Sequence, residues 1–309
     1  MSDFTKWAKQ QKHILLDSSM GLGLGQQGFD LNNCLWTAAA LGKNIDLVEN
    51  VHRKYFDSGS NLSSLDTYQA SVPGLLDAGC SKEQAVNLLE RSVKAGKEGR
   101  KTSQAPQRKW LAAAIGSYGA YLANGAEYTG DYDLTSKQYL DFHRDRIDTL
   151  INAGVDVVMV KTMPNFKEIQ TVVKYLNHYH VPVTVTCILQ DGEHIADGTP
   201  ITVVQDFLEQ QPCVIAYGVN CVKPELVTPV IKTVSAHLNN HKDLMVFPNL
   251  GAKYNPTIKK WTSKGISEHD FNRLAKQWIQ LGAKYIGGCC CMTTQRTQSL
   301  HRLLVEIDN

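Results

Sequence analysis

The feature of this sequence that most restricts its fold is a regular alternation of short apolar runs and longer amphipathic stretches. The apolar runs that read as buried strands are 14–17, 111–116, 155–160, 181–188, 214–218, 244–247, 284–286 and, less clearly, 61–66. Most are rich in Val and Ile without polar alternation, which is typical of parallel strands covered on both faces. Eight strand–helix units without a linker predict an α/β fold, a single (β/α)8 TIM-type barrel over residues 1–309, with a doubly wound sheet as the main alternative.

The stretches between these runs show helical periodicity. Ser81, with Gln84 three residues later, has the pattern of a capping box and predicts the start of a helix. Ser136 is expected to begin another helix. The remaining expected helices are 166–176, 203–208, 225–238, 271–281 and 297–305.

The charge balance excludes several classes of partner. The chain has 32 Lys and Arg against 30 Asp and Glu, a net charge of +2, and so offers no strongly basic surface to nucleic acid or an anionic membrane. No apolar run approaches the roughly 18–20 residues of a spanning helix, and the polar segment 1–13 does not resemble a signal peptide. We therefore expect a cytoplasmic protein without nucleic-acid or membrane partners. The sequence leaves the oligomeric state open, a homo-oligomer included.

Cysteines are concentrated where two of the predicted strands end. Cys221 follows the sixth strand, and Cys289, Cys290 and Cys291 follow the eighth. Carboxyl ends of barrel strands meet at one face, where three thiolates would suit a catalytic zinc ion with one open position. The glycines at 287–288 would let adjacent cysteines face one ion, whereas strict strand alternation would pair Cys289 with Cys291. Buried thiols that act as small apolar residues are the plain alternative.

These motifs resemble those of the homocysteine S-methyltransferase family. The specific ones are Gly-Val-Asn-Cys at 218–221 and Gly-Gly-Cys-Cys at 287–290, and the similarity extends over about residues 13–305. Other similar segments are 67–70, 118–121, 127–132, 197–199 and 248–249. The resemblance implies a (β/α)8 barrel that holds Zn²⁺ on Cys221, Cys289 and Cys290. It also implies methyl transfer to homocysteine from a sulfonium donor, S-methylmethionine or S-adenosylmethionine, which gives methionine.

Side chains at the predicted strand ends are the candidates for contacting substrate. We expect no catalytic residue beyond the zinc ligands. The expected substrate-binding residues are Asp17, Tyr118, Lys161, Asn220 and Asn249. Tyr118 could contact the sulfonium through its ring, because aromatic faces attract cations, or it could pack within its own loop. Asn220 could instead fix the turn that carries Cys221.

The sequence departs from the family's pattern at several of these sites, namely Ser18, Ser19, Gly23, Lys161, Leu250 and Ala252. The departure at Lys161 matters most, because the family's usual residue there is Glu and a lysine would repel the ammonium of homocysteine. Lys161 could turn to solvent or pair with Asp17, or it could bind a carboxylate on a different thiol. The third alternative is a zinc-binding barrel with little methyl transfer. If the family's geometry holds, Lys161→Glu should strengthen homocysteine binding.

Overall fold

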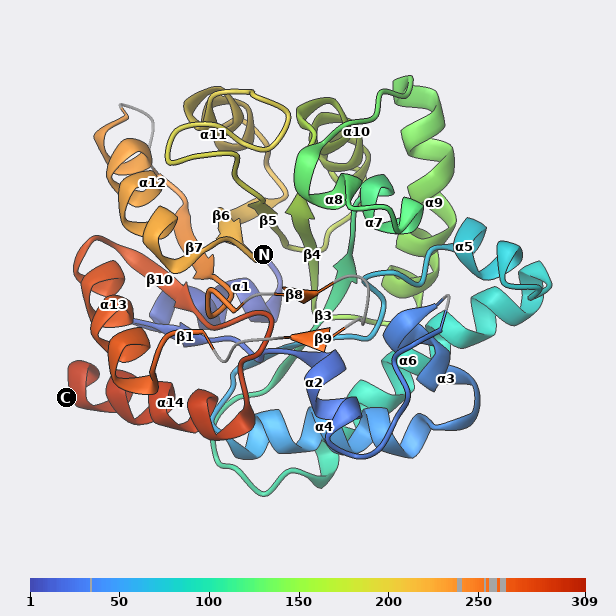
Figure 1. Cartoon of the computed structure of the whole chain (residues 1–309), viewed down its shortest axis with the longest axis horizontal. Coiled ribbons are helices and arrows are strands. Elements are labelled where there is room, and N and C mark those ends of the chain that lie inside the picture. Colours follow the sequence, from blue (N-terminus) through green and yellow to red (C-terminus); the bar gives the residue numbers. More distant parts are fainter. Residues whose placement is uncertain (34, 238–240, 253, 256–259, 262–264) are drawn as a thin grey trace.

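The computed structural model describes residues 1–309 except 34, 238–240, 253, 256–259 and 262–264. In the described chain eight parallel strands form one sheet in the order β1-β10-β7-β6-β5-β4-β3-β2. The strands are β1 (Ile14–Leu15), β2 (Leu62–Ser64), β3 (Trp110–Ile115), β4 (Val157–Met163), β5 (Val183–Cys187), β6 (Val214–Asn220), β7 (Asp243–Phe247) and β10 (Ala283–Ile286). A parallel bridge between Leu16 and Leu62 joins the two ends of this order. The sheet therefore closes, and the barrel is confirmed over the doubly wound alternative (Figure 1).

Helices cover the outside of the barrel (Figure 1). They are α1 (Asp3–Gln10), α2 (Met20–Gly25), η1 (Trp36–Ala39), α3 (Ala40–Lys43), α4 (Ile45–Asp57), α5 (Val72–Asp77), α6 (Lys82–Thr102), α7 (Tyr118–Leu122), α8 (Ala126–Thr129), α9 (Ser136–Asn152), α10 (Phe166–Leu176), α11 (Ile201–Glu209), α12 (Pro224–Ala236), α13 (Glu268–Gln280) and α14 (Thr294–Asp308). A short antiparallel hairpin, β8 (Tyr254–Asn255) and β9 (Lys260–Trp261), precedes α13. Each expected strand and helix corresponds to an observed element, with ends shifted by a few residues.

Two helix starts show how local sequence sets these boundaries. Ser81 and Gln84 form the predicted capping box of α6. Helix α9 begins at Ser136 as expected, and its cap is Thr135, which forms a second capping box with Gln138. Helix α12 ends at Ala236, whereas position 238, where the sequence places the end, lies outside the described residues.

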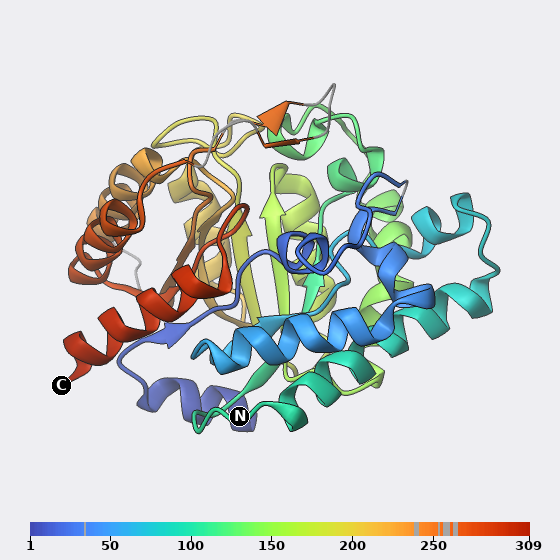
Figure 2. The same ribbon diagram turned by 60° about the horizontal axis from the view of Figure 1, so that its bottom comes forward.

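The barrel interior is apolar, and its amino-terminal end is closed by α1. Phe4 of α1 belongs to the same buried cluster as Leu62, Met159 and Met245 inside the barrel. Figure 2 shows α1 at the opposite end of the barrel from the β8–β9 hairpin. Because strand side chains alternate, every second residue faces inward, and the last inward positions line the carboxyl-terminal mouth. On β4, the inward position after Met159 is Lys161.

Gly218 shows how tightly the strands pack beside this mouth. A Cβ at Gly218 would lie 1.9 Å from the carbonyl oxygen of Met245 on β7. The backbone of a central strand cannot move away cheaply, so we expect Gly218→Ala to lower the free energy of unfolding by about 1–3 kcal/mol. Gly42→Ala in α3 is the matched control, since a Cβ there meets no atom within 4 Å in the described structure. Urea denaturation of both variants checks this, and equal stabilities would contradict it.

Candidate metal centre and active site

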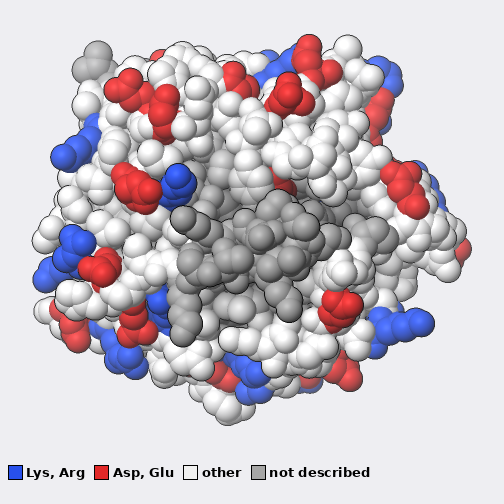
Figure 3. Space-filling model, viewed as in Figure 1, with Lys and Arg blue, Asp and Glu red and all other residues white. Residues whose placement is uncertain are grey.

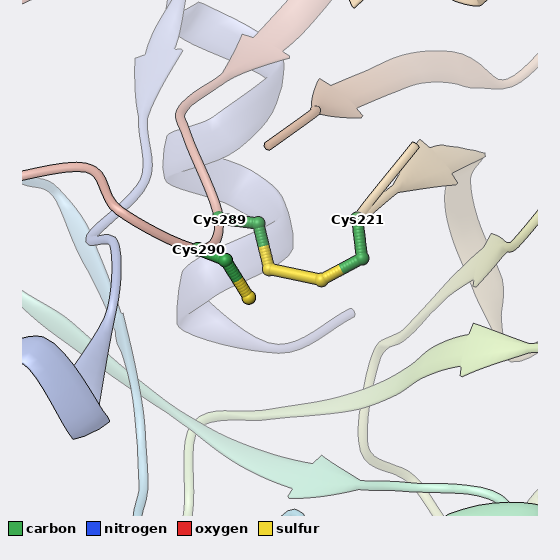
Figure 4. A group of neighbouring side chains, drawn as sticks. All are labelled: Cys221, Cys289 and Cys290. Atoms are coloured by element: carbon green, nitrogen blue, oxygen red, sulfur yellow. A yellow bond between two sulfur atoms is a disulfide. The ribbon is translucent and has the colours of Figure 1, made fainter. Parts of the chain in front are cut away.

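Three cysteine sulfurs converge at the carboxyl-terminal mouth of the barrel. Cys221 directly follows β6, and Cys289 and Cys290 follow β10. Their Sγ atoms lie within 4.8 Å of one another. Cys221 and Cys289 are joined as a disulfide, while the Cys290 thiol is free and points toward the same space (Figure 4). The two strand ends therefore meet where the topology of the predicted barrel places them.

The end of β7 holds the two cysteine-bearing segments in place. The Cys221 amide donates to the carbonyl oxygen of Phe247 (3.2 Å), and the Cys289 amide donates to that of Pro248 (2.8 Å). The Asn249 side chain donates to the Cys221 carbonyl (3.0 Å). Cys221 itself has φ 53°, a left-handed conformation that turns the chain sharply off β6. In this structure the side chain of Asn249 is thus hydrogen-bonded to the backbone of Cys221.

A turn, and not an extended strand, carries the consecutive cysteines. The amide of Met292 donates to the Cys289 carbonyl (3.3 Å), and Cys291 has φ 67°. This turn brings Cys290 to the same side as Cys289, whereas Cys291 packs against the apolar layer between barrel and helices. Among the described residues it is Cys290, not Cys291, that completes the group of three.

The chemistry of this group fits a zinc ion once the disulfide is reduced. Thiolates are soft ligands that favour zinc, and Zn–S bonds of about 2.3 Å in a tetrahedron place sulfurs roughly 3.8 Å apart. The observed grouping within 4.8 Å is compatible with that arrangement. Burial raises the pKa of the Cys290 thiol to about 12, so without a bound cation this sulfur stays protonated at neutral pH.

Lys161 lies at the mouth of the barrel and is only partly exposed. Its Nζ donates to Ser64 Oγ (3.2 Å) and lies 5.9 Å and 5.8 Å from the ring centroids of Tyr68 and Phe247. Burial lowers the pKa of Lys161, and the negative charges of Asp17 and Asp66 oppose that effect. Of the alternatives for Lys161, a full turn to solvent is not observed, and among the described residues neither is an ion pair with Asp17 within 4.0 Å.

Asp17 is buried across the junction of β1 and β2. Its carboxylate accepts hydrogen bonds from Ser63 Oγ (2.8 Å) and from the amide of Ser64 (2.7 Å), and Ser64 Oγ lies 3.2 Å from its other oxygen. Burial raises the pKa of Asp17 to about 6, although Lys161 and these hydrogen bonds lower it. Both oxygens of Asp17 thus already have partners within the chain.

Asp66 is a second buried carboxyl at the mouth, and no role was predicted for it from the sequence. It lies two residues beyond Ser64 and is 3% exposed. Its side chain bonds to Thr37, but within the described structure its Oδ2 has no hydrogen-bond partner. Burial raises the pKa of Asp66 to about 7. Its place two residues after the inward Ser64 is the sequence signal that could have identified it.

This raised pKa predicts a dependence of stability on pH. Between pH ~4 and ~7 the unfolded chain loses the Asp66 proton while the folded chain keeps it, so wild-type stability falls as pH rises. Asp66→Asn cannot lose this proton. From about pH 5 to 6.5 the variant should therefore gain about 2 kcal/mol relative to wild type, at 1.36 kcal/mol per unit. Urea denaturation at several pH values measures the difference, and a constant difference would contradict the prediction.

Asn220 and Tyr118 are placed differently from the other expected contacts. Asn220 is fully buried, accepts from the Thr162 amide (2.8 Å) and Thr186 Oγ1 (2.7 Å), and donates to Thr162 Oγ1 (2.7 Å). It thereby holds Thr162, next to Lys161, at φ 58°. The Tyr118 ring packs against Phe142, with centroids 5.1 Å apart. Both side chains are thus engaged with the chain itself.

Two of the departures from the family's pattern have local explanations. A Cβ at Gly23 would lie 2.9 Å from the Val51 side chain, so α2 packs closely on α4 and leaves no room there. Ser19 caps α2 by accepting from the Leu22 amide (3.1 Å).

A buried polar network supports the mouth from outside the barrel. Arg146 on α9 donates to the carbonyls of Tyr68 (3.0 Å) and Gly116 (2.8 Å), which follow β2 and β3. His143 lies between Arg146 (2.8 Å) and Glu168 of α10 (2.6 Å). Both Arg146 and Glu168 are essentially unexposed. The network therefore joins two helices to the segment that carries Tyr68, which faces Lys161.

The outer surface agrees with the charge balance of the sequence. On the face seen in Figure 3, acidic and basic residues are interspersed around the described rim. No helix in the described part of the chain is both long and apolar enough to cross a membrane.

Comparison with known proteins gives a consistent result. The model of the family described as homocysteine S-methyltransferase matches residues 14–304. Homocysteine S-methyltransferase 3 of Zea mays is 35% identical over 305 residues, covering 94% of this chain and 90% of the relative. Homocysteine S-methyltransferase of Escherichia coli is 34% identical over 289 residues, covering 92% and 93%.

Two solved structures of the homocysteine methyltransferase MmuM from Escherichia coli are also similar. The metallated form has a TM-score of 0.85 at 31% identity, covering 96% of this chain and 98% of that one. The oxidized form has a TM-score of 0.83 at 31% identity, with 97% of each chain covered.

Proposed function

This chain belongs to the homocysteine S-methyltransferase family, and we propose that it transfers a methyl group from a sulfonium donor, S-methylmethionine or S-adenosylmethionine, to homocysteine to give methionine. The observation that carries the proposal is the convergence of three cysteine sulfurs within 4.8 Å at the barrel mouth. We propose Zn²⁺ as the resident metal and Cys221, Cys289 and Cys290 as its ligands. The similarity to the metallated MmuM structure supports a metal at this position.

The bound metal would lower the pKa of a coordinating substrate thiol, which is otherwise near 8.5, so that the nucleophile is a thiolate at neutral pH. The remaining task of the protein is to position the reactants. A bond forms between the homocysteine sulfur and the methyl carbon as the bond from that carbon to the donor sulfur breaks. The electron pair stays on the donor sulfur, which becomes a neutral thioether. Such a displacement needs the three atoms in line, so side chains that hold both reactants in this alignment would raise the rate.

The described contacts support different roles for the expected substrate-binding residues. Asp17 and Lys161 would set the charge of the substrate site. Asn220 and Asn249 would act by positioning, because their side chains bond to Thr162 and to the Cys221 carbonyl. Tyr118 would meet the donor only through the part of its ring that Phe142 leaves free.

A second reading is favoured by the cation at Lys161. The same metal-binding barrel could accept a different thiol, or transfer methyl groups poorly, if this cation repels the ammonium of homocysteine. Its contact with Ser64 inside the mouth keeps the charge where a substrate would lie.

The deciding experiment incubates reduced, zinc-loaded protein with homocysteine and one donor at a time. Homocysteine carries carbon-13 in its carbon chain and the donor carries a deuterated methyl group, and methionine that contains both labels is followed by mass spectrometry. Labelled methionine with one donor supports the proposal and identifies that donor. If neither donor yields labelled methionine above the Cys290→Ser control, the methyltransferase proposal fails and the second reading gains.

A further inference from the structure

Two opposite charges face the barrel mouth without neutralising each other. Lys161 Nζ contacts Ser64 Oγ (3.2 Å), and within the described residues it has no carboxylate oxygen within 4.0 Å. Asp66 Oδ2 is buried and, in the same part of the chain, has no hydrogen-bond donor. A buried carboxylate oxygen without a donor is costly unless something else occupies it. Both groups are therefore available to a ligand.

Asp17 is less suited to that role, although it is also buried at the mouth. Its oxygens already accept from Ser63 Oγ, the Ser64 amide and Ser64 Oγ. A ligand ammonium at Asp17 would have to displace or share these donors. The side chain of Asp66 bonds to Thr37, but among the described residues its Oδ2 has no hydrogen-bond donor.

The two free charges lie near each other and near the cysteine group. Lys161 Nζ contacts Ser64 Oγ, and Asp66 lies two residues beyond Ser64, so strand alternation places both charges on the inner side of the barrel at its carboxyl-terminal end. The charges of Asp17 and, less strongly, of Asp66 raise the pKa of Lys161, in agreement with this placement. A separated cation and carboxylate beside a thiol-binding centre match a ligand that carries an ammonium, a carboxylate and a sulfur.

We propose that Asp66 and Lys161 form the head-group site for an α-amino acid thiol, with Asp66 Oδ2 accepting from its ammonium and Lys161 Nζ donating to its carboxylate. This assignment rests on the proposed function for the identity of the thiol, and it makes Lys161 a partner of the substrate and not an obstacle to it. Charge-assisted hydrogen bonds of this kind are roughly twice as strong as neutral ones, so each should be visible in affinity.

The test compares three thiols that differ only in the head group. L-Homocysteine has both charges, 4-mercaptobutanoate lacks the ammonium, and 3-aminopropane-1-thiol lacks the carboxylate. Binding to reduced, zinc-loaded protein is measured by isothermal titration calorimetry for wild type, Asp66→Asn and Lys161→Met. Asp133→Asn, which removes an exposed carboxylate paired with Lys167, is the control.

We expect a crossed pattern, in which each of the two variants weakens the binding of a different pair of thiols. Asp66→Asn should weaken homocysteine and 3-aminopropane-1-thiol by about tenfold or more and leave 4-mercaptobutanoate within about twofold. Lys161→Met should weaken homocysteine and 4-mercaptobutanoate and spare the aminothiol. Asp133→Asn should change none of them. Equal losses for all three thiols in either variant, or no loss for homocysteine, would overturn the head-group site.

Wild-type protein alone provides a second check that does not depend on how the variants fold. It should bind homocysteine at least about tenfold more tightly than either analogue. Equal affinity for homocysteine and 4-mercaptobutanoate would show that no ammonium site exists. The crossed pattern without labelled methionine would refute the proposed reaction and leave the head-group site standing. Labelled methionine without the crossed pattern would do the reverse.

Discussion

Cys290→Ser is expected to yield protein with less than about a tenth of an equivalent of zinc and methyl transfer reduced roughly a thousandfold or more. A serine hydroxyl is a poor zinc ligand, and the two remaining thiolates are one fewer than the three protein ligands of a catalytic zinc site. Loss of the metal removes an effect worth several kcal/mol in the transition state, and each 1.36 kcal/mol is tenfold in rate. Metal analysis of protein purified under reducing conditions, together with the labelled-methionine assay, measures both losses.

Cys291→Ser is the matched control for this prediction. Cys291 is the adjacent residue, but its side chain packs against the apolar layer outside the barrel. It should keep about one equivalent of zinc and near wild-type activity. If Cys291→Ser lost the metal and Cys290→Ser retained it, the ligand pair would be the one that strict strand alternation favours.

Arg146→Met is expected to lower the free energy of unfolding by about 3–5 kcal/mol, because it removes one partner from a buried charged network. The substitution leaves the carbonyls of Tyr68 and Gly116 without their donor. It also removes the group that bonds His143 Nδ1. Guanidinium denaturation followed by circular dichroism gives the value.

Arg144→Met provides the comparison for this variant on the same helix. Arg144 is about half exposed, and its guanidinium is 3.9 Å from Asp141 one turn earlier. An exposed pair of this kind contributes little, so the variant should stay within about 0.5 kcal/mol of wild type. A loss below about 1 kcal/mol for Arg146→Met would show that water replaces the guanidinium at little cost.

The fold was predictable because the strands are buried on both faces and therefore stand out as short runs of Val and Ile. The convergence of the cysteines followed from the same reasoning, since parallel strands bring their carboxyl ends to one face. The choice between Cys290 and Cys291 was not predictable from spacing. It depends on a turn at Cys289–Met292 that breaks the alternation of the strand.

The charge environment of Lys161 was the main feature that could not be predicted from the sequence. Considered alone, this lysine predicts repulsion of an ammonium and improvement by Lys161→Glu. The structure places it near Asp17 and Asp66, which lie about 95 or more residues away in the chain and approach it only in the closed barrel. A glutamate there would join two buried carboxyls without a cation, so we now expect Lys161→Glu to weaken homocysteine binding.

The network of His143, Arg146 and Glu168 was missed for a related reason. Its residues lie on the helices α9 and α10, where the helical period alone predicts only that one face is buried. Which polar groups form hydrogen bonds across that face depends on how the two helices pack. A single sequence has no pattern that indicates this packing.

Asp17 also contributes hydrogen bonds across the junction between β1 and β2. Strand β1 has two residues, and its backbone meets β2 through the amides of Asn61 and Asp17, which donate to Leu15 (2.7 Å) and Leu62 (2.9 Å). The Asp17 carboxylate then crosses the same seam to Ser63 and Ser64. Amide hydrogen exchange should therefore reveal local opening here first, and Asp17→Ala should accelerate it. A loss of turnover in Asp17→Ala could therefore result from opening of the barrel as well as from loss of a substrate contact.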